Sequence, residues 1–70
     1  METVEIIIKI NPITETICIE FSKGKYKEVD SEKELMEVLE NFHTILKNSG
    51  FEMKLIDRRA EYYKWKLNLN

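Results

Sequence analysis

Cysteine and histidine are the residues that could supply a nucleophile and a base here, and the chain holds one of each, Cys18 and His43. A catalytic thiolate needs a basic neighbour and, as a rule, a third group that orients the base. No such third group is evident in the sequence. The surrounding pattern favours Cys18 on the outer face of a sheet and His43 beside the apolar stripe of a helix. We therefore expect no catalytic residues and a protein that is not an enzyme.

Metal and nucleotide sites also lack their usual residue patterns. A zinc site takes three or four closely spaced Cys, His or carboxylate ligands, whereas the single Cys and single His lie 25 positions apart. Phosphate-binding loops need clustered glycines, and the two glycines, Gly24 and Gly50, are expected in a turn and at a helix end. Glu37 and Glu40 are typical of a solvated helix face. The sequence predicts neither a metal ion nor a cofactor.

Length and composition indicate one small folded domain, residues 1–70, with 43% hydrophobic and 34% charged residues. A net charge of −2 argues against a basic face for duplex DNA and against a nucleic-acid mimic. The apolar run 6–8 is too short for a signal peptide or membrane span, and one cysteine favours a reducing compartment. We expect a cytoplasmic protein without membrane contact. Because so short a chain buries only about 60% of its surface, dimerisation would help its stability.

A helix between Ser31 and Gly50 is the clearest element. Ser31 is placed to cap the first turn, Glu34 completes a capping box, and Gly50 suits a left-handed stop. Between these ends, apolar side chains recur at helical spacing. They form one wide stripe, which contains Leu35, Leu39, Phe42 and Leu46.

Two-residue alternation predicts strands before this helix, over residues 4–10 and 16–21. A loop at 11–14 would set Ile8 opposite Ile17, with Ile6 opposite Ile19 and Val4 opposite Phe21. A turn at Lys23 and Gly24 would add a third, shorter strand, in which Tyr26 faces Phe21. In that register the outward face of the sheet carries Ile7, Cys18 and Val29.

The C-terminal segment allows two interpretations. Tyr63, Trp65, Leu67 and Leu69 alternate with polar residues, which favours a strand that pairs back on 51–56 and sets Met53 opposite Trp65. A helix is the alternative, because Ile56, Ala60, Tyr63 and Leu67 also fit a helical stripe. If the segment is a strand, the fold class is α+β. An antiparallel sheet, made of an N-terminal β-meander and a C-terminal hairpin, then packs on one central helix, and the element order is ββ(β)αββ.

The helix and its ending carry a resemblance to a group of known proteins. Residues 35–42, followed by Ile45-Leu46 and Ser49-Gly50-Phe51, resemble the helix and Gly-Phe ending of many small proteins encoded by bacteriophages and prophages. The resemblance implies a small protein that binds and blocks a host enzyme, a defence complex or a viral partner. It implies no activity and no site residues.

Basic and aromatic residues concentrate in the last twenty residues, which carry a net charge of +2 against −4 for the first fifty. Tyrosine, tryptophan and arginine dominate protein interfaces, whereas the same mixture can stack single-stranded bases and neutralise phosphates. A third interpretation places the aromatic rings in the core. We predict a non-enzymatic protein-binding module, a phage-type inhibitor or a homodimer, with single-stranded nucleic-acid binding as the alternative. The candidate contact residues are Arg58, Arg59, Tyr62, Lys64, Trp65, Lys66 and the outward Ile7.

Overall fold

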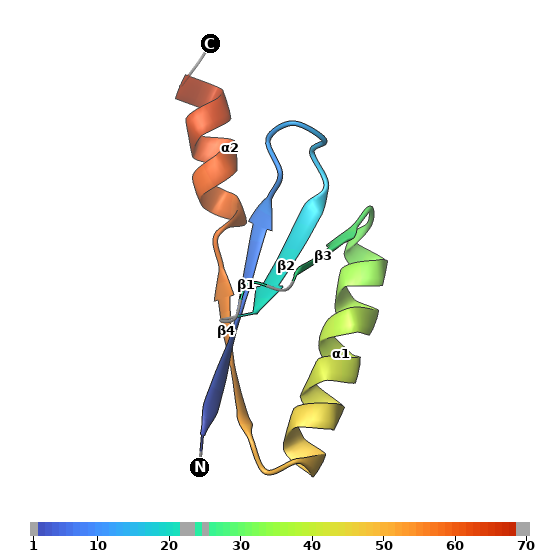
Figure 1. Ribbon diagram of the computed structural model, residues 1–70. Coiled ribbons are helices and arrows are strands. Elements are labelled where there is room, and N and C mark those ends of the chain that lie inside the picture. The colour runs from blue at the N-terminus through green and yellow to red at the C-terminus, as the bar shows by residue number, and fades with distance from the viewer. Residues whose placement is uncertain (1, 22–23, 25, 69–70) are drawn as a thin grey trace.

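The computed structural model describes residues 2–21, 24 and 26–68, and it confirms an α+β fold with a four-stranded sheet and two helices (Figure 1). The elements follow one another as β1 (Thr3–Ile10), β2 (Ile17–Phe21), β3 (Tyr26–Val29), α1 (Glu32–Asn48), β4 (Glu52–Asp57) and α2 (Arg59–Asn68).

The sheet has the order β3-β2-β1-β4 and is mixed rather than wholly antiparallel. Strands β1, β2 and β3 form the expected antiparallel meander. Strand β4, however, lies parallel to β1 at the other edge. The reason is that α1 carries the chain back along the sheet, so β4 must run in the same direction as β1.

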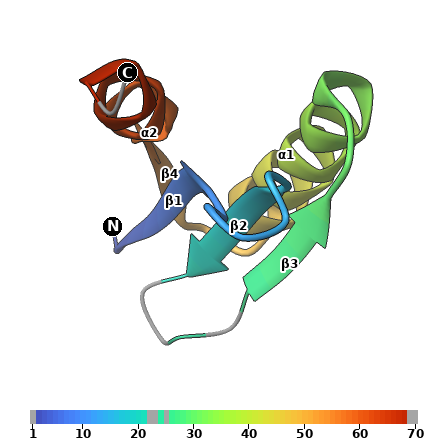
Figure 2. The same ribbon diagram turned by 90° about the horizontal axis from the view of Figure 1, so that it is seen from above.

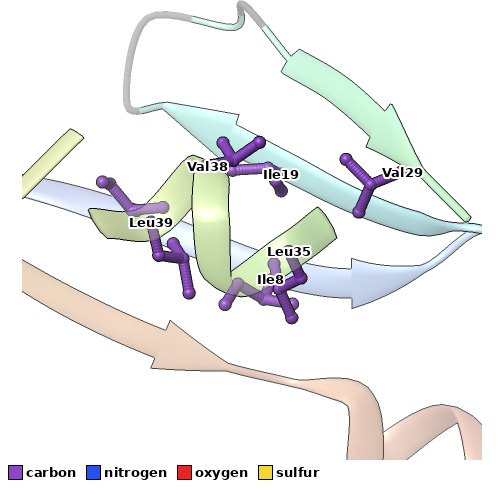
Figure 3. Close-up of a cluster of buried hydrophobic side chains, with 7 residues drawn as sticks. Ile8, Ile19, Val29, Leu35, Val38 and Leu39 are labelled. Carbon is purple, nitrogen blue, oxygen red and sulfur yellow. The ribbon is translucent and has the colours of Figure 1, made fainter. Parts of the chain in front are cut away.

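Helix α1 covers one face of the sheet, and the core lies between them (Figure 3). The capping prediction is confirmed, because the Ser31 hydroxyl accepts from the Glu34 amide at 3.1 Å. The stop is confirmed as well: Gly50 has a φ of 81°, and the Phe51 amide donates to the Leu46 carbonyl at 2.9 Å. Among the described residues, seven buried side chains form the cluster beneath α1, namely Ile6, Ile8, Ile19, Val29, Leu35, Val38 and Leu39.

The β1–β2 register differs from the predicted one by two residues. Ile10 pairs with Ile17 and Ile8 with Ile19, because the connection closes at residue 16 instead of 14. The Asn11 amide donates to the Thr16 carbonyl at 2.9 Å, which makes the loop two residues longer than expected. A shift of two residues keeps each side chain on its face, so the predicted inward and outward sets survive.

The β2–β3 register is shifted by one residue, and this shift reverses the faces of β3. Tyr26 pairs with Glu20, and Val29 pairs with Ile17. Val29 is therefore 1% exposed in the core beneath α1, and its predicted place on the outward face beside Cys18 is wrong. Of the predicted turn, Gly24 has a φ of 85°, whereas Lys23 lies outside the described residues.

The predicted C-terminal hairpin is wrong, and the helical alternative is correct. Residues 59–68 form α2, while β4 takes β1 as its partner and needs no strand from the C-terminal segment. Asp57 starts the helix, since its carboxylate accepts from the Arg59 amide at 3.0 Å. Met53 lies opposite Val4 rather than Trp65. Leu69, the last residue of the alternating pattern, lies outside the described residues.

The two helices stand apart, which makes the molecule long and open (Figure 2). Its principal extents are 46, 21 and 17 Å, and its radius of gyration is 13.3 Å. A compact domain of this length has a radius of gyration of about 11 Å. Helix α2 is the reason, because it extends beyond the end of β4 and none of its residues is buried.

Candidate functional site

Arg59 anchors the start of α2. Its Nε donates to both carboxylate oxygens of Asp57 at 3.0 and 3.2 Å, and one terminal nitrogen lies 2.7 Å from Asp57 Oδ2. The other terminal nitrogen lies 2.6 Å from Glu32 Oε2, at the first residue of α1. The hydrogen bonds from Arg59 lower the pKa of Asp57, and the same contacts raise the pKa of Arg59. Arg59, a predicted contact residue, therefore joins β4, α2 and α1 within the molecule.

A second contact holds α2 against the β1–β2 loop. Lys66 Nζ lies 3.0 Å from Glu15 Oε1, and it stands 5.7 Å from the ring centroid of Tyr62. The hydrogen bond between Lys66 and Glu15 raises the pKa of Lys66 and lowers that of Glu15. Both side chains are at least half exposed, so this pair orients the helix more than it stabilises the fold.

An exposed aromatic and apolar surface covers the rest of α2. The Tyr62 ring lies 5.4 Å from Tyr63 in an edge-on arrangement and 5.9 Å from Trp65 in a tilted one. Tyr63 is 54% exposed, Trp65 52% and Leu67 73%, whereas Tyr62 is half-buried. We call these four residues the α2 surface. Helical geometry puts Tyr63 and Leu67 on one side of α2, and it puts Tyr62 and Trp65 on the other side.

The other predicted contact residues are divided between α2 and the sheet. Arg58 and Lys64 are exposed beside and on α2, and in the described part of the chain neither forms a salt bridge. Ile7 is half-buried in β1 and pairs with Ile56 of β4. It lies on the sheet face away from α1, so the structure groups the helical residues but leaves Ile7 apart from them.

Four further large apolar side chains of the described residues are exposed and were not anticipated, namely Ile13, Met36, Ile45 and Leu55. Met36 on α1 is 50% exposed, and Leu55 on β4 is 46% exposed. Met36 lies one turn after Glu32 on the same flank of α1. The ion pair between Glu32 and Arg59 shows that this flank faces the end of β4. Leu55 pairs with the buried Ile6, so it points to the α1 side of the sheet. Only the parallel placement of β4 puts Met36 and Leu55 on the same side of the molecule, which is why the sequence pattern missed them.

The two residues with nucleophile and base chemistry are not brought together. Cys18 is 5% exposed on the sheet face away from α1, and burial raises the pKa of its thiol, with a further contribution from its contact to Glu28. His43 is exposed on α1 and lines a depression with Lys47, Phe51 and Met53. Among residues 2–21, 24 and 26–68, no three His, Cys, Asp or Glu side chains are grouped closely enough to hold a metal ion.

No family model, curated protein or solved structure matches this chain. Within the described residues, no helix has both the length and the apolar character needed to cross a membrane.

Proposed function

We propose that this chain is a non-enzymatic protein-binding module whose contact region is the α2 surface. The observation that carries this proposal is a ten-residue helix with no buried residue that nevertheless exposes Tyr63, Trp65 and Leu67 by more than half. Large apolar side chains grouped on one exposed element are typical of an interface.

The energetics of α2 support the same proposal. An isolated helix of this length is marginal in water. Among the described residues, α2 is held by the Asp57 carboxylate at its start, by its two ion-paired anchors and by the half-buried Tyr62. Trp65 lies on the other side of α2 from Tyr63 and Leu67, so a partner that covers all three contacts both sides of the helix. Such a partner adds the apolar burial that the monomer lacks, because aromatic rings contribute large areas at low entropic cost. Inhibition of a host or defence protein stays a prediction from the resemblance of residues 35–51.

A capture experiment tests the proposal. The full chain, carrying an affinity tag, is expressed beside an untagged copy, and all captured proteins are quantified, including that copy. We expect Trp65→Ala and Tyr63→Ala to reduce the capture of the main partner at least about tenfold, as hot-spot truncations do. Ile45→Ala is the matched control, because Ile45 is 60% exposed on α1, away from α2. Equal capture by all four proteins would contradict the proposal.

Single-stranded nucleic-acid binding is the second candidate, and the exposure of Trp65 beside the Tyr62 ring favours it. Two of the three basic residues of α2, Arg59 and Lys66, already pair with carboxylates, which reduces the charge offered to phosphates. Quenching of Trp65 fluorescence by a single-stranded oligonucleotide, reversed by added salt, would support this candidate. Absence of quenching at low salt would exclude it.

A further inference from the structure

We propose that the partner of the α2 surface is a second copy of this chain, which receives α2 against its own α1 and β4. This inference rests on the proposed function and names its partner. Three observations support it: the amount of surface left open, the directions of the two helices, and their opposite charges.

The monomer exposes more surface than its size requires. A folded monomer of 8.4 kDa is expected to expose about 4,600 Å², whereas this chain exposes 5446 Å². The excess of roughly 800 Å² equals the area that each partner contributes to an interface of standard size. Covering α2 and the side of the molecule that receives it would bring the chain to the compactness expected of a small domain.

The two helices run in opposite directions along the molecule, α1 from the end of β3 and α2 from the end of β4, as Figure 1 shows. Their first turns are linked by the ion pair between Arg59 and Glu32. A two-fold axis near this ion pair would reverse both helices, so α2 of each copy would run along α1 of the other. With ten and seventeen residues, α2 and α1 are about 15 and 25 Å long, so α1 is long enough to cover α2. The dimer is symmetric and cannot extend into a filament, because α2 of each copy occupies the α1 side of the other.

The receiving side has the chemistry that α2 needs. Met36 and Leu55 are exposed on the side of the molecule where α1 faces β4. Met36 lies four residues after Glu32, and Tyr63 lies four residues after Arg59, so the two would be level in the dimer, with Leu67 one turn further along.

Helix α1 carries four glutamates and two lysines, whereas α2 carries three basic residues and one glutamate. Arg59 and Lys66 already pair with carboxylates of their own chain, so the attraction of α2 to the acidic α1 of a second copy comes mainly from Lys64, and it disfavours a basic partner.

Sedimentation equilibrium of the full chain tests this inference at micromolar to submillimolar concentrations. We expect a mass of twice 8.4 kDa at the upper end of this range. Met36→Lys and Leu67→Glu should each raise the dissociation constant of the dimer at least about tenfold, because each puts a charge into its apolar centre. In the double variant Met36→Lys/Leu67→Glu, the two new charges lie one helical turn apart across both contacts, within reach of the long lysine side chain, so the dimer should be partly restored.

Ile45→Lys is the matched control for the α1 substitution. Ile45 is 60% exposed and lies nine residues after Met36, which places it half a turn round on the opposite flank. It should leave the dissociation constant unchanged. All substituted side chains are exposed, so far-UV circular dichroism should show each variant folded.

A chain that remains monomeric at every concentration would overturn the inference. So would a dimer that neither Met36→Lys nor Leu67→Glu weakens, since the copies would then associate elsewhere, for example through the open edge of β4. In both cases the capture experiment still tests the proposed function. The wild-type chain would then capture a protein other than its own copy, and Trp65→Ala would capture less of that protein.

Discussion

Replacing Arg59 with methionine is expected to destabilise the fold and to release α2. Methionine keeps most of the aliphatic length of arginine but removes all the donors that reach Asp57 and Glu32. The variant therefore separates the ion-paired junction from simple packing of the stem. In this variant, Asp57 at the end of β4 and Glu32 at the start of α1 lose the cation that they share.

The loss in the free energy of unfolding that we expect for Arg59→Met lies between two limits. Hydrogen bonds to charged groups contribute up to about 3 kcal/mol, whereas fully exposed ion pairs contribute less than about 1 kcal/mol. Arg59 has a side chain that is 24% exposed, but its partners Asp57 and Glu32 are 42% and 62% exposed, so solvent screens part of the attraction. We expect a loss of about 1.5 kcal/mol in the free energy of unfolding, or roughly 6–12 °C in Tm for a domain of this size.

The pH dependence identifies the cause. Arg59 holds the pKa of Asp57 below its ordinary value of 3.8. The stabilisation is therefore complete above pH 3.8 and is lost as the pH falls through the lower, folded-state pKa. The difference between wild type and Arg59→Met should shrink over this acidic range.

The assay is thermal and urea unfolding followed by circular dichroism at fixed protein concentration, at neutral pH and at several acidic values. Arg58→Met is the control, because Arg58 is exposed and forms no salt bridge in the described part of the chain. It should change the free energy by less than about 0.5 kcal/mol. If Arg59→Met and Arg58→Met were equally stable, or if the difference did not vary with pH, the role assigned to Arg59 would be wrong.

Three further predictions concern the rest of the fold. Ile19→Ala removes a side chain that is 0% exposed in the core, so urea unfolding should show a loss of about 2–5 kcal/mol; a loss below 1 kcal/mol would mean that the site collapses. Gly50→Ala should cost about 1 kcal/mol through its φ of 81° alone, because no atom lies within 4 Å of the added methyl, and Gly50→Asn should cost less. Cys18 should react with a thiol reagent far more slowly in the native than in the unfolded chain, since it is 5% exposed and its thiol has a raised pKa; equal rates would contradict its burial.

Local signals in the sequence were sufficient for α1 and for the first two strands. Ser31, Glu34 and Gly50 act through hydrogen bonds within a few residues, so their roles can be deduced without knowledge of the fold. The alternation in β1 and β2 likewise identified the buried set, and the two-residue error in register did not disturb it because faces repeat every two residues.

Tertiary structure decided the register of β3, the place of β4 and the state of the C-terminal segment. Alternation shows that residues 26–29 form a strand but not which face is inward, and Val29 became buried because α1 lies above it. The sequence pattern of residues 63–69 fits both a strand and a helix. In the structure β4 pairs with β1, so β4 needs no strand from the C-terminal segment, and residues 59–68 form a helix. That pairing joins residues about fifty positions apart, so no local pattern contains it.

The candidate site combines both kinds of information. The sequence by itself located the basic and aromatic residues of the C-terminal segment, because composition does not depend on folding. Whether those rings lie in the core or on the surface was decided by the tertiary structure, which formed the core from α1 and the sheet without α2. Met36 and Leu55 likewise share one side of the molecule only because β4 pairs in parallel with β1 beneath α1. The physical reason is that burial depends on long-range pairing, whereas caps, turns and periodicity depend on neighbours.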